Sequence, residues 1–455
     1  MPTPLPPTPS APLARFLEKL ALHRPELRAW ALYDWANSAM FTVIVTAVFP
    51  IFYRQVAAVG LDDEAKRATF GWATTASLLF AALLSPLLGA VADCARLKKK
   101  LFGVFLAVGV GSTALMFCIG EGDWRLAAWL FGLANIGAAG GFVFYDALLS
   151  SVARSDEVDR LSTTAYAVGY LGGGLCLALC LAPILWPATF GFASGPDAGA
   201  DAASLPTRVG FLVVAAWWVV FSIPFFRHVK EPALALETDE RRGENPVRVA
   251  FTRLGETFRE LRSYKDAFLF MLAFLIFNDG IGTIIRMAAL FGDERNIDRE
   301  TMIGAILLVQ FVGIPFAVLF GKLAGWIGAK RSILVALVAY VGITLLAYRM
   351  DTVGEFLVMA VCVGMVQGGA QALSRSLFST LVPKHKSGEF FGLFSTLEKF
   401  AGVLGPLVFS LATTSGAAIL SLLAFFVVGG ALLCFVDVEA GRKKAAEADA
   451  GLVSA

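Results

Sequence analysis

Seven charged residues lie inside long apolar stretches of this 455-residue chain, where their side chains could bind protons, ions or a charged solute. A charge near the middle of a bilayer costs roughly 2.5 kcal/mol or more, so such residues face protein or a water-filled cavity. The pattern therefore predicts a polar site within a membrane protein. The seven residues are Asp34, Asp146, Asp279, Arg286, Arg375, Glu398 and Lys399.

The composition supports a membrane protein. Hydrophobic residues make up 57% of the chain and charged residues 16%, where soluble proteins carry roughly 25% charged residues. The mean hydropathy is +0.70. The 38 Lys and Arg residues nearly balance the 36 Asp and Glu residues, which excludes a polybasic nucleic-acid binder.

Motifs of enzymes and ATP-driven pumps do not occur in the sequence. It has no H-E-x-x-H, no G-x-S-x-G and no G-x-x-x-x-G-K-[ST] pattern. Its six cysteines do not make a disulfide framework. We expect no enzymatic activity, no cofactor and no metal site.

Twelve apolar stretches are long enough to cross a bilayer core of roughly 30 Å. They predict an all-α integral membrane protein. Residues 1–12 are rich in proline and lack the pattern of a signal peptide, so they are expected to be a disordered leader. The expected spans are 29–53, 68–92, 101–119, 124–152, 161–188, 207–226, 266–291, 301–321, 332–349, 354–381, 389–413 and 416–436.

The positions of Lys and Arg predict the orientation, because basic residues stay on the cytoplasmic side. With the N-terminus inside, 27 of the 38 lie in inner segments and 8 in outer loops. Both termini are therefore expected in the cytoplasm. The expected organisation is a cytoplasmic segment 1–28, a six-helix half 29–226, a linker 227–265, a second half 266–436 and a tail 437–455.

The linker 227–265 is hydrophilic and carries a periodic stretch from Val247 to Leu261. This stretch predicts an amphipathic helix at the membrane surface. The alternative is a plain linker without a regulatory role.

The two halves repeat a short basic turn. The turn after the second span reads Gly89-Ala-Val-Ala-Asp93-Cys-Ala-Arg96-Leu-Lys98, and the turn after the eighth runs from Gly321 through Gly325 and Gly328 to Lys330. Gly140-Gly141 and Gly368-Gly369 repeat in the fourth and tenth spans. Two related six-helix halves favour an alternating-access transporter with its site near the bilayer midplane.

The turn resembles the cytoplasmic signature of the major facilitator superfamily, which locks helix ends together. Gly89, Asp93 and Lys98 match the signature, while Arg96 replaces its later glycine. In the second copy Gly321, Gly328 and Lys330 match, and Gly325 replaces the acidic residue. The resemblance implies a gating lock that differs between the two halves.

Further motifs resemble the vacuole-effluxer-like family of that superfamily. They are Tyr33-Asp34-Trp35-Ala36-Asn37-Ser38, Ala165-Tyr166-Ala167-Val168-Gly169-Tyr170-Leu171-Gly172-Gly173-Gly174, Asn278-Asp279-Gly280, Gln367-Gly368-Gly369-Ala370-Gln371-Ala372-Leu373-Ser374-Arg375-Ser376, Phe390-Phe391-Gly392-Leu393 and Gly405-Pro406. The resemblance covers about residues 28–436. It implies the twelve-helix major facilitator fold in two pseudo-symmetric halves, with helices one, four, seven and ten lining a cavity. The fungal relatives export amino acids from the vacuole.

Charge positions agree with such a cavity. The third, sixth, ninth and twelfth spans, which should face lipid, carry no charge in their interiors. At 1.5 Å per residue, Asp34, Asp146 and Arg375 lie about 9–14 Å from the cytoplasmic ends of their helices. They could meet in one layer, where a salt bridge between Asp146 and Arg375 would hold the inner side closed.

Asp279 lies near the middle of its helix and is the first candidate for a proton-coupling carboxylate, followed by Asp34 and Asp146. A carboxyl group removed from water takes up a proton more readily. No histidine lies in a span, so a proton relay here would use carboxylates. Arg286 follows Asp279 by seven residues and lines the cavity or extends to the outer surface.

The remaining candidates for the cavity each have a structural alternative. Gln367, Gln371 and Arg375 recur every four residues, which fits a polar stripe or interhelical hydrogen bonds. Asn37 would face the cavity with Asp34, or the pair would cap the first helix. Tyr145, Tyr166, Tyr170 and Trp35 could stack on a ligand or pack the bundle. Asn278 is grouped with Asp279.

The sequence therefore predicts a secondary transporter of a small polar organic solute, with amino acids as a candidate cargo, coupled to protons. We expect a monomer in the bacterial inner membrane, whose partners are the solute, protons and the lipid bilayer. The alternative is a receptor or structural membrane protein that moves no solute.

Overall fold

The computed structural model describes residues 12–193, 199–232, 235–236, 264–294, 297, 299–411, 415–450 and 453–454. Side chains from 286 to 296 and from 400 to 418 lie outside the described part, including that of Arg286. The periodic stretch from Val247 to Leu261 and most of the 1–12 leader also lie outside it.

The first half of the chain forms helices that run back and forth along one bundle. After the short helix α1 (Pro12–Lys19) comes the first long segment, which joins α2 (Pro25–Ala39), η1 (Met40–Ala47), α3 (Phe49–Phe52) and η2 (Tyr53–Ala57). The rest of this half comprises α4 (Asp63–Ala95), α5 (Lys98–Leu115), η3 (Met116–Cys118), α6 (Trp124–Ala147), α7 (Leu149–Val152), α8 (Val158–Leu185), η4 (Pro187–Phe190) and α9 (Ala200–His228).

The second half repeats this architecture. Its elements are α11 (Lys265–Glu294), α12 (Arg299–Ile327), α13 (Ala329–Tyr348), α14 (Val353–Leu381), η5 (Lys384–Lys386), α15 (Ser387–Leu411), α16 (Ser415–Cys434) and α17 (Val438–Ala450). A two-residue strand β1 (Ala235–Leu236) pairs antiparallel with β2 (Val453–Ser454).

Ten segments of the described chain are long and apolar enough to cross a membrane. An eleventh, Ile419–Cys434, passes together with Val438–Ala450, from which it is bent by 62°. The helix α15 occupies the position of the remaining expected span. The expected spans therefore coincide with helical segments, although α4 and α12 extend several residues beyond their expected ends.

Capping residues explain where two of these helices begin. The Asp62 side chain accepts a hydrogen bond of 2.7 Å from the Ala65 amide at the start of α4. At the start of α14, Thr352 and Glu355 form a reciprocal capping box. Both caps satisfy amides that the helix itself leaves without acceptors.

The first span differs from the plain helix that its hydropathy predicts, because η1 and η2 are π-helical. The Val48 amide donates to the Val43 carbonyl at 2.7 Å, and the Ala58 amide donates to Tyr53 at 2.8 Å. Pro50 lies between the two segments and has no amide to donate, which interrupts the regular helical pattern. Apolar periodicity alone does not reveal such wider turns.

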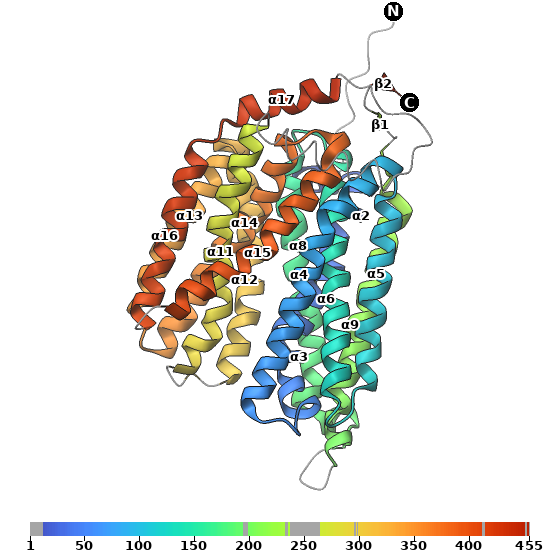
Figure 1. Cartoon of the computed structure of the whole chain (residues 1–455), viewed down its shortest axis with the longest axis vertical. Helices are drawn as coiled ribbons and strands as arrows, with labels where there is room; N and C mark the ends of the chain where they lie inside the picture. The colour runs from blue at the N-terminus through green and yellow to red at the C-terminus, as the bar shows by residue number, and fades with distance from the viewer. Residues whose placement is uncertain are drawn as a thin grey trace, which may run out of the picture.

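Each half has a hydrophobic core of its own. Large apolar side chains are exposed on the outer faces of α5, α9, α13 and α16, as expected for helices against lipid. Examples are Val104, Val220, Val338 and Val427. The halves lie side by side, and the pairs α4 with α15 and α8 with α12 connect them (Figure 1).

The helix α17 lies across one end of the second half, near the ends of α11 and α14 (Figure 1). We call this end of the molecule the α17 end. The helices α2, α11 and α15 begin here, while α6 and α14 end here.

Candidate functional site

Arg375 on α14 connects the second half to two carboxylates of the first. Its Nη2 lies 3.0 Å from Asp34 Oδ2 on α2, and its Nη1 lies 3.3 Å from Asp146 Oδ1 on α6. The Arg375 side chain is 4% exposed. The expected pair between Asp146 and Arg375 is thus present, and Asp34 joins it in the same layer. We call these three residues the ion-pair cluster.

Arg375 also donates two hydrogen bonds to Ser162 on α8. Its Nε donates to Ser162 Oγ at 3.0 Å, and Nη2 also donates to the Ser162 carbonyl at 3.2 Å. The Ser162 hydroxyl donates onward to the Ala372 carbonyl at 2.7 Å. A buried ion pair is stable only when its other donors and acceptors are satisfied, and Ser162 on α8 accepts two of these hydrogen bonds.

Aromatic rings enclose the guanidinium of Arg375. Its central carbon lies 4.7 Å from the ring centres of Trp30 and Tyr166 and 5.5 Å from that of Tyr145. The rings of Trp30 and Tyr145 are stacked at 4.4 Å, and each residue hydrogen-bonds the other's backbone carbonyl. Cation–π contacts of this kind are worth about 2 kcal/mol when water is excluded.

These contacts place Tyr145 in the wall of the ion-pair cluster, with no exposed surface. Tyr166 likewise packs on Arg375. In this conformation the buried Tyr145 ring packs within the bundle, whereas Tyr166 keeps part of its surface exposed. The sequence did not predict a role for Trp30 or Ser162. Trp30 stands one helical turn before Asp34, but a serine inside a helix carries no distinguishing signal.

The close packing of α8 on α2 fixes the position of Asp34 along the axis of the bundle. A Cβ added to Gly169 would lie 2.7 Å from Ser38 Oγ, and one added to Gly172 would lie 2.7 Å from the Trp35 carbonyl. Larger residues would push the two helices apart. The glycine run of the fifth span therefore serves helix contact, which brings Asp34 and Ser162 to the same side of the bundle.

The first copy of the basic turn joins the halves at the α17 end. Lys98 Nζ lies 2.6 Å from Asp93 Oδ1 and 2.9 Å from Ser387 Oγ. Asp93 Oδ2 accepts a hydrogen bond of 2.9 Å from the Glu389 amide at the start of α15. The Asp93 carboxylate thus meets the positive end of a helix dipole from the other half.

Glycines let α4 and α15 touch beside this contact. A Cβ on Gly89 would lie 2.1 Å from the Gly388 carbonyl oxygen, and one on Gly392 would lie 2.5 Å from the Ser85 carbonyl oxygen. The two backbones are therefore in direct contact. We call Gly89, Asp93, Lys98, Ser387 and Gly388 the first lock.

The second copy of the turn uses packing without charges between the halves. A Cβ on Gly321 of α12 would lie 2.2 Å from Thr163 Oγ1 of α8. Lys330 Nζ instead donates to the Cys434 and Val436 carbonyls at 2.8 Å each, within its own half. Gly328 precedes α13 with φ +85°, a conformation that favours glycine.

Two basic residues of the repeated turn thus lie outside the contact between the halves. Lys330 was expected to help lock helix ends, and its ammonium binds the free carbonyls at the end of α16 within its own half. Arg96 is exposed, with φ +53°, and donates to the Glu231 carbonyl at 3.2 Å. The two copies therefore differ, as the exchanged acidic residue and glycine suggest.

The helix α17 holds the turn that precedes the first lock. Asp449 lies 2.9 Å from His385 Nδ1 and accepts a hydrogen bond of 3.0 Å from the Lys384 amide. Burial alone would raise the pKa of Asp449, but the hydrogen bonds from His385 and the Lys384 backbone outweigh it and lower that pKa. Arg442 Nε also donates to Thr380 Oγ1 at 3.2 Å.

The lowered pKa of Asp449 predicts a pH-dependent attachment of α17. Because the folded pKa is below the unfolded value of about 3.9, the ionised carboxylate stabilises the fold above that pH. The stabilisation is lost as the pH falls through the folded pKa. We expect Asp449→Asn to cost about 1–2 kcal/mol at pH 7 and to flatten this acid dependence. Thermal unfolding in detergent between pH 7 and pH 3 measures both effects.

Glu447→Gln is the matched control on the same helix. Glu447 is 59% exposed and lies 3.9 Å from the exposed Lys443. It should leave unfolding at pH 7 and its acid dependence close to wild type. Equal effects of the two variants would contradict the role of the Asp449 contact.

Four of the residues expected in the cavity lie outside the contacts of Arg375. Asp279 on α11 is 1% exposed, and its backbone carbonyl accepts a hydrogen bond of 2.7 Å from Thr283 Oγ1. Asn278 is 8% exposed. Gln367 and Gln371 on α14 are half-buried. Arg286, the remaining expected cavity residue, lies outside the described side chains.

Asp34 and Asn37 do not cap the first helix. The helix α2 begins at Pro25, two turns before Asp34, and the Asp34 carboxylate binds Arg375. Asn37 is 1% exposed, and neither atom of its amide has a hydrogen-bond partner among the described residues. The capping alternative is therefore wrong, since both side chains point into the bundle.

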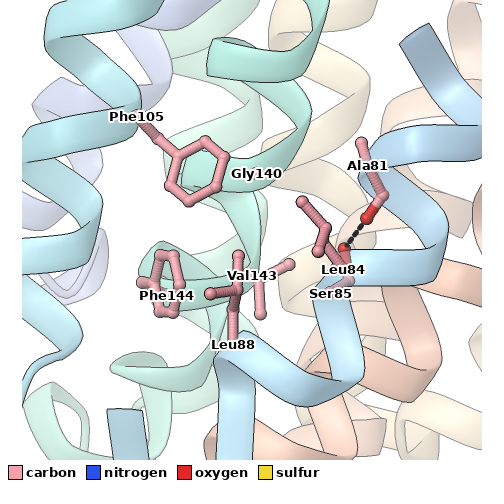
Figure 2. Close-up of a pocket in the computed structure, with 8 residues that line it drawn as sticks. All are labelled: Ala81, Leu84, Ser85, Leu88, Phe105, Gly140, Val143 and Phe144. Carbon is pink, nitrogen blue, oxygen red and sulfur yellow. Dashed lines mark hydrogen bonds between the residues drawn. The ribbon is translucent and has the colours of Figure 1, made fainter. Parts of the chain in front are cut away.

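A small pocket lies within the first half, between α4, α5 and α6 (Figure 2). Ala81, Leu84, Leu88, Phe105, Val143 and Phe144 line it together with Gly140 and Ser85. The Ser85 hydroxyl is bound to the Ala81 carbonyl at 2.5 Å. This pocket presents no charge and does not suit a polar solute.

Solved structures of similar fold are transporters. The human organic anion transporter MFSD10 is 14% identical with a TM-score of 0.68, covering 90% of this chain and 99% of the other. The proton:xylose symporter XylE is 13% identical with a TM-score of 0.65, covering 96% and 99%. Two helical halves joined by these contacts have the major facilitator fold.

Sequence comparison identifies the family. The family model "Vacuole effluxer Atg22 like" matches residues 70–446, and the chain belongs to this family. The MFS-type transporter YxiO of Bacillus subtilis, described as uncharacterized, is 36% identical over 90% of this chain and 94% of its own length. Autophagy-related protein 22 of Yarrowia lipolytica is 30% identical over 64% of this chain. The chain spans about half the length of this fungal relative.

Proposed function

We propose that this protein is a secondary transporter that moves a small polar organic solute by alternating access, with amino acids as the first cargo class to test. The observation that carries the proposal is the ion-pair cluster, in which Arg375 of one half binds Asp34 and Asp146 of the other. Contacts between halves that consist of a few charged groups can be made and broken as the halves rock.

The proposed orientation places the α17 end in the cytoplasm, because most Lys and Arg residues lie on that side. The ion-pair cluster and the first lock then form an inner gate, which is closed in this structure. Inward opening requires Arg375 to leave both carboxylates and Lys98 to leave Ser387. We propose the bacterial inner membrane as the location and a monomer as the working unit.

Reconstituted flux tests the transporter proposal. Purified full-length protein in proteoliposomes is expected to move at least one solute of a panel of amino acids, peptides, sugars and organic acids, and a pH gradient should change the rate. A receptor or structural protein would move none of them with or without the gradient. A thermal-shift screen with the same panel selects ligands first, because a ligand that binds the folded state raises its stability.

Asp279 is the proposed proton-coupling carboxylate. Asp279→Asn keeps the shape of the side chain and removes its titration, so uptake driven by the pH gradient should fall by about a hundredfold or more, the range found for general acid–base groups. Exchange of labelled for unlabelled solute should persist, because it needs no net proton movement. Both are measured in proteoliposomes.

Asp63→Asn is the control for this experiment. Asp63 lies at the start of α4 with its side chain 71% exposed, far from a coupling role. Its gradient-driven uptake should equal that of wild type. Wild-type uptake by Asp279→Asn would remove Asp279 from the coupling mechanism and leave Asp34 and Asp146 as candidates.

A further inference from the structure

Each of the three guanidinium nitrogens of Arg375 already donates a hydrogen bond, which bears on where a charged cargo binds. Nε, Nη1 and Nη2 each bind an oxygen of Ser162, Asp146 or Asp34, and three aromatic rings cover the remaining faces. The Arg375 side chain is also only 4% exposed, so a cargo carboxylate has little access to the guanidinium while the ion-pair cluster is intact. Charged groups that a cargo can reach while the gate is closed must therefore be elsewhere.

Three stacked aromatic side chains of the second half, Phe274, Phe378 and Phe394, form a layer that we call the aromatic floor. Phe394 on α15 stacks on Phe274 of α11 at 4.3 Å and on Phe378 of α14 at 4.6 Å. One turn farther from the α17 end, α15 carries Glu398, α11 carries Asn278 and α14 carries Arg375. At 1.5 Å per residue, the three lie about 5–6 Å above the floor, in one layer.

The layer of Glu398 is more exposed than the aromatic floor below it. Glu398 is exposed and Lys399 is half-buried, whereas Phe394 is 4% exposed and Phe391 is 1% exposed. The first lock and the contact of Gly321 with Thr163 close the α17 end. The exposed surface of Glu398 therefore belongs to the side opposite the gate.

Glu398 and Lys399 face the first half and not the lipid. Glu398 interacts electrostatically with Lys399 and Arg375 of its own half and with Asp146 and Tyr166 of the first half, and Lys399 also interacts with Asp146. A lipid-facing carboxylate at this depth would also be costly. Asn278 beside them is 8% exposed, and its Oδ1 has no hydrogen-bond partner among the described residues.

Lys399 makes hydrogen bonds that bonds to a ligand can replace. Its ammonium donates to the Ser395 hydroxyl and, at 3.2 Å, to the Ser395 carbonyl, both one turn back on its own helix. Both acceptors are neutral. A carboxylate from a cargo would form a charge-assisted hydrogen bond, which is roughly twice as strong as a neutral one.

We propose that Lys399 and Glu398 are the residues that bind the charged groups of the cargo, Lys399 taking a carboxylate and Glu398 an ammonium group, while Arg375 serves the gate. This inference rests on the proposed transport function. The two residues are adjacent and point about 100° apart on α15, so they can receive two different groups of one small solute.

The same placement links cargo binding to gate opening. An ammonium group held by Glu398 lies near Asp146 and competes with Arg375 for that carboxylate. Loading the site therefore weakens the contact between Asp146 and Arg375, and inward opening follows binding. Energy for this shift comes from the difference in cargo affinity between the two conformations.

Three isosteric probes test the assignment on reconstituted full-length protein. L-Leucine carries both charges, L-leucinamide lacks the carboxylate, and 2-hydroxy-4-methylpentanoate lacks the ammonium group. Lys399→Gln should weaken L-leucine binding by about tenfold or more and leave L-leucinamide binding unchanged, since one charge-assisted contact is lost. Glu398→Gln should weaken L-leucine binding likewise and leave the hydroxy acid unchanged. Lys443→Gln, at an exposed residue of α17, is the control.

The binding results for the two variants decide whether Lys399 and Glu398 bind the charged groups of the cargo. Wild-type affinity for L-leucine in both variants, or an equal loss for all three probes, would overturn it, because a structural role does not distinguish the charges of the ligand. If the wild type transports another solute and binds none of the probes, the inference fails and the transport proposal stands. If the wild type moves no solute of the panel, the transport proposal itself fails.

Discussion

Gly89→Val is expected to prevent closure of the α17 end and to reduce transport. The new side chain would begin 2.1 Å from the Gly388 carbonyl oxygen, and that neighbour is backbone, which cannot rotate away. Overpacking typically costs about 1–3 kcal/mol, and the upper end applies where no side chain can yield. A cost of about 3 kcal/mol shifts the ratio of closed to open molecules about a hundredfold.

Spin labels on the two halves measure this shift. Cysteines replacing Lys100 on α5 and Lys444 on α17, in a background without the native cysteines, place labels at exposed positions of the α17 end. The distance between the labels should lengthen in Gly89→Val, and solute flux should fall because the closed conformation is no longer reached.

Gly71→Ala on the same helix is the control. Nothing lies within 4 Å of a Cβ added to Gly71, so this variant should keep the wild-type label distance and flux. An unchanged label distance in Gly89→Val would show that α4 and α15 separate without cost and that the first lock does not hold the halves.

The ion-pair cluster was predictable because its geometry depends on helix rise alone. Asp34, Asp146 and Arg375 lie at similar depths in helices of fixed pitch, so their meeting follows once the helices adjoin. Neighbours around the cluster depend on how the helices are rotated and packed. Trp30 and Ser162 could not be found in this way, since the sequence does not say which face of α8 meets α14.

The repeated motifs predicted where their residues lie in each half better than they predicted which groups those residues contact. Gly321 and Lys330 occupy the same place in the second half as Gly89 and Lys98 in the first, yet Lys330 binds carbonyls of its own half. The reason is the missing acid, because Gly325 stands where Asp93 stands in the first copy. Without that carboxylate, no counter-charge draws the lysine toward the other half.

Arg375→Gln is expected to destabilise the closed conformation more than any other change at the ion-pair cluster. It leaves Asp34 and Asp146 buried without a counter-charge, and breaking a buried pair in this way costs about 3–5 kcal/mol. Asp146→Asn should cost less, because Asp34 still binds Arg375 at 3.0 Å. Populations of the open and closed label distances at positions 100 and 444 give both free energies.

The double variant decides whether Asp146 and Arg375 act as a pair. Groups in direct contact show coupling energies of about 0.5–3 kcal/mol, so the double variant should cost less than the sum of the single variants. Arg160 and Asp156 provide a reference cycle, with side chains 36% and 77% exposed and 3.9 Å apart. Their coupling should stay below about 0.5 kcal/mol, because solvent screens an exposed pair. Additive costs for Asp146 and Arg375 would mean that the gate does not depend on their contact, and Asp34 would then be the carboxylate that holds Arg375.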